Sequence, residues 1–164
     1  MAVEHHQRRV RSEILTARQG LLAGLVGGVA LTVVASGLSL AAGRGLWMPV
    51  NAAASFWLGL RPVPAGWAGF GSLLGVAVIL LTAGLLGVLY ASAQEPVDTP
   101  SLLLIAVYYG FSTWFVANFL LLSWLNPAVR AVWQSWPVLL GHLVYGATLG
   151  IRAAARNPWH KPKT

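Results

Sequence analysis

The chain has 164 residues, of which 57% are hydrophobic and only 9% are charged. This composition excludes an ordinary soluble domain, in which about a quarter of the residues are charged. The chain also has no cysteine, four histidines and four acidic residues, so little material is available for acid–base catalysis, thiol chemistry or a metal site. We therefore expect a membrane protein with no catalytic residues, no metal and no cofactor.

Four apolar stretches are long enough to cross a bilayer, whose hydrocarbon layer of roughly 30 Å needs about 20 helical residues. They contain no Asp, Glu or Lys, and the first is too long for a cleaved signal sequence. The sequence therefore predicts an all-α integral membrane protein with a single membrane domain. Its predicted parts are a tail at 1–19, transmembrane spans at 20–42, 68–92, 101–124 and 137–154, and a tail at 155–164.

The formal net charge of +7 comes mainly from the two ends of the chain. Because Lys and Arg are enriched on the cytoplasmic side of membrane proteins, this distribution predicts that both termini are cytoplasmic. It also accounts for the charge without a nucleic-acid partner, and none is expected. Eight of the eleven basic residues lie in these end regions: Arg8, Arg9, Arg11, Arg18, Arg152, Arg156, Lys161 and Lys163.

Two apolar stretches between the spans are too short to cross the membrane, and we predict that they form short interfacial helices on the outer side. The first would start at Pro49 and the second at Pro127, with Asn126 as its N-cap. On the first helix, Val50, Ala53, Trp57 and Leu60 would share one face, and Asn51, Ser55 and Gly59 another. On the second, one face would carry Val129, Val132, Trp133 and Trp136, and the other Arg130 and Gln134.

Most of the tryptophans fall at this same outer boundary, where an indole can bury its ring and bond headgroups through its N–H. The predicted interface anchors are Trp47, Trp57, Trp67, Trp124, Trp133 and Trp136.

The two halves of the chain follow the same order of span, Trp-containing corner, short helix and second span. Leu-Leu-Gly occurs near the start of each second span, at 73–75 and 139–141. This likeness suggests a tandem repeat of helix pairs, related by an axis along the membrane normal because both halves enter from the same side.

Glycines recur every four residues in three of the spans. Small residues at this spacing let helix backbones approach closely, either within the bundle or against a partner. The predicted helix-packing residues are Gly20, Gly24, Gly28, Gly71, Gly75, Gly146 and Gly150.

Asn118 and His142 are the strongly polar side chains inside the predicted spans. Both lie at similar depth below the outer boundary, so we predict a hydrogen bond between them. For His142 three roles remain open: a structural polar contact, proton handling or gating, and ligation of haem or a chlorophyll-type pigment. The equivalent residue of the first half is Val76, so a second axial histidine would have to come from elsewhere.

Three short motifs resemble those of small four-span bacterial inner-membrane proteins, including the YagU-like group. They are Gln19-Gly20-Leu21-Leu22-Ala23-Gly24, Leu125-Asn126-Pro127 and Gly141-His142-Leu143-Val144-Tyr145-Gly146. The resemblance implies a bacterial plasma-membrane location and a role beside larger energy-transducing complexes, and it carries no catalytic residues.

Taken together, these features favour a non-catalytic accessory or assembly subunit that packs against a larger membrane complex. The expected partners are the lipid bilayer and other membrane subunits or further copies of the chain. The alternative is a small homo-oligomeric channel or transporter with His142 in its pathway.

Overall fold

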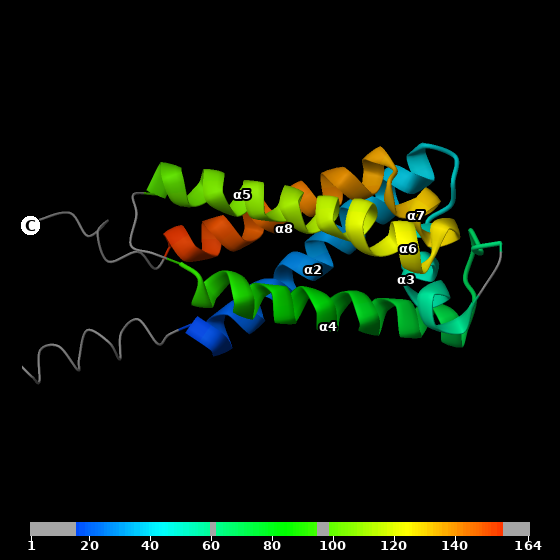
Figure 1. The fold of residues 1–164 in the computed structure, drawn as a ribbon, viewed down its shortest axis with the longest axis horizontal. Helices are drawn as coiled ribbons and strands as arrows, with labels where there is room; N and C mark the ends of the chain where they lie inside the picture. The colour runs from blue at the N-terminus through cyan, green and yellow to red at the C-terminus, as the bar shows by residue number, and fades with distance from the viewer. Residues whose placement is uncertain (1–15, 60–61, 95–98, 156–164) are drawn as a thin grey trace, which may run out of the picture.

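Four long helices run side by side in the structure, a computed structural model that describes residues 16–59, 62–94 and 99–155 (Figure 1). No strand occurs among these residues. The long helices are α2 (Thr16–Ala41), α4 (Phe70–Ser92), α5 (Thr99–Phe115) and α8 (Trp136–Ala154). α5 continues through a π-helical turn, η1 (Val116–Leu121), into α6 (Leu122–Leu125).

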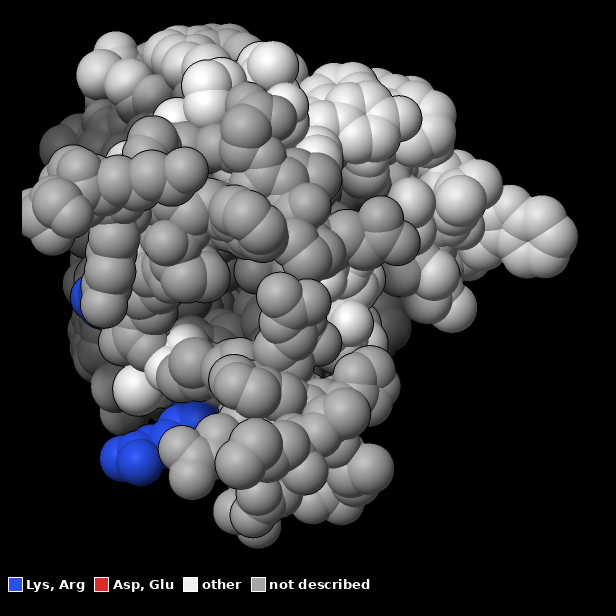
Figure 2. Space-filling model, turned by 90° about the vertical axis from the view of Figure 1, so that its left-hand side faces the viewer, with Lys and Arg blue, Asp and Glu red and all other residues white. Residues whose placement is uncertain are grey.

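Two short helices, α3 (Met48–Leu58) and α7 (Pro127–Trp133), lie together with α6 at one end of the bundle, which we call the cap end (Figure 1). α2 begins and α8 ends at the opposite end, which we call the base. Figure 2 looks onto the base, and the basic side chains that it shows at the edge are arginines, since no Lys lies in the described part of the chain. Arg18 and Arg152, near these two helix ends, are both exposed.

Three helical segments are apolar and long enough to cross a membrane: Ala17–Ala41, Phe70–Ser92 and Pro100–Leu125. They correspond to the predicted spans 20–42, 68–92 and 101–124, and they identify the chain as a membrane protein by length and composition. The fourth predicted span, 137–154, is a helix, but α8 does not meet the same criterion. His142, Arg152 and the glycines of α8 lower its hydropathy, so four spans are not confirmed. Residues 1–15 and 156–164 of the predicted tails lie outside the described residues.

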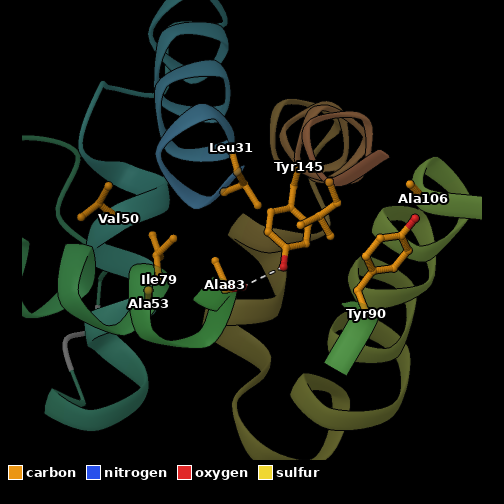
Figure 3. Packing of buried hydrophobic residues seen from close by; sticks show 9 residues of the cluster. Leu31, Val50, Ala53, Ile79, Ala83, Tyr90, Ala106 and Tyr145 are labelled. Carbon is orange, nitrogen blue, oxygen red and sulfur yellow. Dashed lines mark hydrogen bonds between the residues drawn. The ribbon is translucent and has the colours of Figure 1, made fainter. Parts of the chain in front are cut away.

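The long helices pack in the order α4, α2, α8, α5, with α2 and α8 in the middle. α4 and α5, at the two ends of this row, are not joined by comparable backbone packing. The main core lies between these helices and α3, and Figure 3 shows the side chains that form it. Leu31 of α2, Val50 of α3, Ile79 of α4 and Tyr145 of α8 all belong to it.

α3 is buried inside the cap end, so its prediction as an interfacial helix is not confirmed. Every residue of the segment 49–55 is buried, on both the predicted apolar face and the predicted polar face. α3 packs against α4, α2 and α7, and backbone carbonyl oxygens of the connection 62–69 accept hydrogen bonds from the side chain of Asn51. Only its last turn is exposed, where Trp57 is 68% accessible. The predicted face residue Leu60 lies outside the described residues.

α7 starts as the sequence predicts. The side chain of Asn126 accepts a hydrogen bond from the backbone N–H of Val129 at 3.3 Å, and Pro127 follows it, so the predicted N-cap is confirmed. Val129 and Val132 are buried against Ala52 of α3. α7 therefore packs against α3 at the cap end.

Both halves of the described chain contain a long helix, a short helix and a second long helix. The matching glycines of the two halves, however, contact different elements. A Cβ added at Gly75 would meet the backbone of Val50 in α3, whereas one added at Gly141 would meet Leu31 and Ala35 of α2. The tandem repeat therefore remains a prediction from the sequence.

Candidate functional site

The glycines of α2 lie against α4. A Cβ at Gly24 would overlap the carbonyl oxygen of Ala83, and one at Gly20 would lie 2.5 Å from the carbonyl oxygen of Gly87. Gly28 faces the methyl group of Ala83 in the same way. These three predicted packing residues therefore hold two helices of the chain itself together. The facing Gly87 was not predicted, although its own small size is what permits the contact.

A second close contact joins α5 to α8. A Cβ at Gly146 would overlap the carbonyl oxygen of Ala106, and one at Gly150 would lie 2.9 Å from the methyl group of Ala106. Gly110 of α5 closes on the carbonyl oxygen of His142. Gly110 was not predicted because it stands alone in its span, without a second glycine at the predicted spacing.

The remaining two predicted packing glycines are near the start of α4. Gly75 is in contact with α3 and not with another long helix, and Gly71 is buried. The glycine-rich faces are thus occupied within the chain, and a partner would have to contact other residues.

Tyrosine hydroxyls, not glycines, connect α4 to α5 and α8, the two long helices with which it lacks close backbone packing. The hydroxyl of Tyr145 donates to the carbonyl oxygen of Ala83 at 2.8 Å, drawn as a dashed line in Figure 3. The hydroxyl of Tyr109 donates to the carbonyl oxygen of Leu86 at 2.8 Å. We call this set the tyrosine seam. Its third member, Tyr90, donates in the other direction, to Leu102 of α5, at 3.5 Å.

A buried polar network fixes the connection between α3 and α4. The amide nitrogen of Asn51 donates to the carbonyl oxygens of Pro64 and Gly66, at 2.8 Å each. Its amide oxygen accepts from the hydroxyl of Ser72 at 2.7 Å, and that hydroxyl accepts from the N–H of Ala68. Asn51 and Ser72 are fully buried, and all four hydrogen bonds of this network are internal. Its role is structural.

The predicted hydrogen bond between Asn118 and His142 is absent. The amide nitrogen of Asn118 donates to the carbonyl oxygen of Trp114 at 2.9 Å, one turn back on its own helix. Nδ1–H of His142 donates to the carbonyl oxygen of Val138 at 2.8 Å, again one turn back. Each side chain therefore bonds to its own helix, an option that similar depth in two neighbouring helices does not reveal.

The two residues nevertheless belong to one polar and aromatic cluster beneath α7. The ring of Trp133 in α7 lies edge-on to that of His142, with centroids 5.9 Å apart. The carbonyl oxygen of Trp133 accepts a hydrogen bond from Nε1 of Trp114 at 2.9 Å. Phe119 lies edge-on to Trp114 at 5.9 Å, and the guanidinium of Arg130 stands 5.5 Å from the Phe119 ring. We call Trp114, Asn118, Phe119, Arg130, Trp133 and His142 the cap cluster.

The cap cluster is the candidate functional site, because it contains the buried polar side chains whose hydrogen-bonding capacity is not fully used. The amide oxygen of Asn118, Nε1 of Trp133 and Nε of Arg130 are all buried and have no hydrogen-bond partner within the described part of the chain. Asn118 also lies in the π-helical turn, and π turns are frequent at functional sites.

The six predicted interface anchors lie at the cap end. Trp57, Trp67, Trp124 and Trp136 are exposed, and Trp47 is half-buried with its ring edge-on to that of Trp67, 4.7 Å away. Trp133 differs from the others, because it packs against all three hydrophobic clusters. Its indole is partly buried, and its Nε1 atom is buried.

For cofactor ligation the site offers a single imidazole. His142 is the one histidine among the described residues, and no group of three or more His, Cys, Asp or Glu side chains occurs there. The ring of Trp133 lies against that of His142, and a second imidazole ligand would have to come from outside the described residues.

Comparison of the chain with family models, with curated proteins and with solved structures finds no match. The fold and the site define the class: an all-helical protein with three helices apolar and long enough to cross a membrane.

Proposed function

We propose that α8 is a fourth membrane span. It packs along both α2 and α5, with Gly141 against Leu31 of α2 and Gly150 against Leu103 and Ala106 of α5. Because α8 contacts both spanning helices between Gly141 and Gly150, we expect it to lie at the same depth in the bilayer as they do. The lower hydropathy of α8 fits this position, because His142 and Tyr145 are buried in the bundle and do not face lipid.

In the proposed orientation the base is cytoplasmic and the cap end is outside. The exposed arginines at the base and the predominance of basic residues in the two tails support this assignment. The exposed tryptophans of the cap end then lie at the outer interface. A bacterial inner-membrane location is part of the proposal and rests on the resemblance to YagU-like proteins.

Within that membrane, the protein acts as a non-catalytic accessory or assembly subunit of a larger complex. The observation that carries this proposal is the difference between the inside and the outside of the bundle. Inside, glycines and tyrosine hydroxyls contact other helices of the same chain, whereas apolar side chains cover the outside. On α4, exposed apolar residues recur with a spacing of four, and most of them are leucines: Leu73, Ala77, Leu81, Leu85 and Leu89. Such a surface suits contact with lipid and with the helices of another subunit.

The second candidate is a small homo-oligomeric channel or transporter with His142 in its pathway. What favours it is the position of His142 beside Trp133, whose indole nitrogen is buried and unpaired. Intramembrane polar groups of this kind mark pathways in many transport proteins.

Purification from native membranes in mild detergent tests the proposal. We expect the protein to co-migrate with a defined set of membrane subunits at fixed stoichiometry, and we expect loss of the protein to reduce assembly of that complex. A lone homo-oligomer that moves a solute in proteoliposomes would refute the accessory role and support the channel. A visible absorption band that disappears in His142→Leu would instead indicate a haem or pigment. Gly37→Ala, at an exposed position of α2, is the control that should change none of these results.

A further inference from the structure

Arg130 carries a positive charge that no acidic side chain of the described residues neutralises. The ranges 16–59, 62–94 and 99–155 contain no Asp and no Glu. Within these ranges the guanidinium also makes no hydrogen bond. An anion that pairs with Arg130 would therefore have to come from outside this part of the chain.

The terminal nitrogens of this guanidinium are accessible to a ligand. Arg130 is partly exposed, and among its side-chain nitrogens only Nε is both buried and without a partner. The two terminal nitrogens, which have no partner in the described residues either, therefore lie at the surface. Their N–H groups form a planar fork that can donate to two oxygens of one phosphate.

Arg130 lies at the level of a membrane boundary. It follows the end of the span-length segment Pro100–Leu125 by five residues, and α7 lies beside α6 at the cap end (Figure 1). Trp124 and Trp136 at the same end are 89% and 49% exposed, as is typical of tryptophans at the level of lipid headgroups. The phosphates of a phospholipid layer lie at this level.

A row of phenylalanine rings continues from Arg130 along α5. The guanidinium stands 5.5 Å from the centroid of the Phe119 ring. Phe119 stacks on Phe115 at 4.8 Å, and Phe115 stacks on Phe111 at 6.3 Å. Phe111 and Phe115 are 38% and 44% exposed. With a spacing of four residues, the three rings cover roughly 12 Å of helix length, from the cap end toward the middle of the span.

We propose that Arg130 and this phenylalanine row bind one anionic phospholipid. The phosphate accepts hydrogen bonds from the terminal guanidinium nitrogens, and an acyl chain lies against the rings of Phe119, Phe115 and Phe111. The charges favour an anionic headgroup, because the described residues offer no carboxylate to the ammonium group of phosphatidylcholine. Phosphatidylglycerol has the phosphate without the cation.

This proposal rests on the membrane class of the chain. It requires neither the accessory role nor the channel, so its failure and that of the proposed function are distinguishable.

Native mass spectrometry of the full chain tests the proposal. The protein is released from nanodiscs that hold phosphatidylglycerol and phosphatidylcholine with identical acyl chains in equal amounts. We expect one phosphatidylglycerol to be retained per chain, with an occupancy severalfold above that of phosphatidylcholine. Titration of the delipidated protein with each lipid then gives the two affinities.

Arg130→Gln should lower the affinity for phosphatidylglycerol by about tenfold or more, the factor that corresponds to a lost hydrogen bond to a charged group. Arg44→Gln is the matched control, because it removes the same charge from an exposed arginine that follows the end of α2 at the cap end. Phe115→Leu, which removes the middle ring at an exposed position, should weaken binding of both lipids and preserve the preference for phosphatidylglycerol.

Equal retention of the two lipids by wild-type protein would overturn the proposal without any variant. Equal losses of affinity in Arg130→Gln and Arg44→Gln would also overturn it, because they would indicate attraction by net charge alone. Two further results would contradict it by identifying another occupant. One is inorganic phosphate that binds the wild-type chain in place of lipid, and the other is a lipid-free dimer that Arg130→Gln dissociates.

Discussion

Glycine residues in this protein act through the backbone atoms that they allow to approach. Gly24 faces the carbonyl oxygen of Ala83 with no room for a methyl group, whereas Gly37, on the same helix, has no heavy atom within 4 Å of its Cβ position. Two glycines of one helix thus have opposite expected responses to the same substitution.

Gly24→Ala should lower the free energy of unfolding by about 1–3 kcal/mol, because the added methyl group forces α2 and α4 apart. Gly37→Ala should leave stability unchanged or raise it by about 0.5–1 kcal/mol, since alanine restricts the unfolded chain. Thermal unfolding in detergent, followed by circular dichroism, measures both. Equal effects of the two substitutions would show that the contact between α2 and α4 does not limit stability.

Asn51 is the polar residue with the largest expected contribution to the fold. Asn51→Leu would leave the carbonyl oxygens of Pro64 and Gly66 and the hydroxyl of Ser72 without their partner. At about 1–3 kcal/mol for each buried unpaired group, we expect a loss of about 3 kcal/mol or more. Protease sensitivity of the 62–69 connection, together with the unfolding temperature, checks this prediction.

Ser92→Ala is the control for this substitution, because its exposed hydroxyl bonds only to Leu89 of its own helix. An Asn51→Leu protein as stable as Ser92→Ala would mean that the network contributes little to the fold.

At the scale of elements, α4 is held in two different ways. Along α2 it makes backbone contact through glycines, and toward α5 and α8 it accepts hydrogen bonds from tyrosine hydroxyls. The second kind of contact is directional and weaker, because each bond between helices in a membrane contributes about 0.6 kcal/mol and rarely more than about 1.7. The tyrosine seam is therefore the most easily opened of the long-helix contacts.

The double variant Tyr109→Phe/Tyr145→Phe should lower the free energy of unfolding by about 1–2 kcal/mol and preserve the fold, because the rings remain. Spin labels on α4 and α5 should show a broader distance distribution, whereas labels on α2 and α4 should show no change. Tyr108→Phe is the control, since Tyr108 is 71% exposed. If the double variant unfolds like Tyr108→Phe, the hydroxyl bonds do not hold the seam.

At the scale of the whole molecule, the membrane sides of the two ends of α8 distinguish three spans from four. If α8 crosses the membrane, its start at the cap end and its end at the base lie on opposite sides. The chain has no cysteine, so single cysteines can be placed without a background.

Gln134→Cys at the cap end and Ala155→Cys at the base, both exposed positions, should react with an impermeant maleimide from opposite sides of the membrane. Ser92→Cys should behave like Ala155→Cys, because both residues lie at the base. Labelling of sealed vesicles of known orientation measures this. Reaction of Gln134→Cys and Ala155→Cys from the same side would exclude α8 as a span.

The sequence by itself determined the membrane class and the positions of the long helices. Length and apolar composition are local properties of a segment. They determine whether a helix can cross the bilayer, independently of the helices against which it packs. The N-cap at Asn126 was equally predictable, because it depends only on the next few residues.

Only the tertiary structure decided what each inward residue touches. His142 and Asn118 each bond to a carbonyl oxygen of their own helix, the connection 62–69 accepts hydrogen bonds from the buried Asn51 of α3, and Trp133 packs against the core. These outcomes depend on helix order and rotation, which follow from contacts between residues far apart in the chain. The periodicity of a single span does not contain that information.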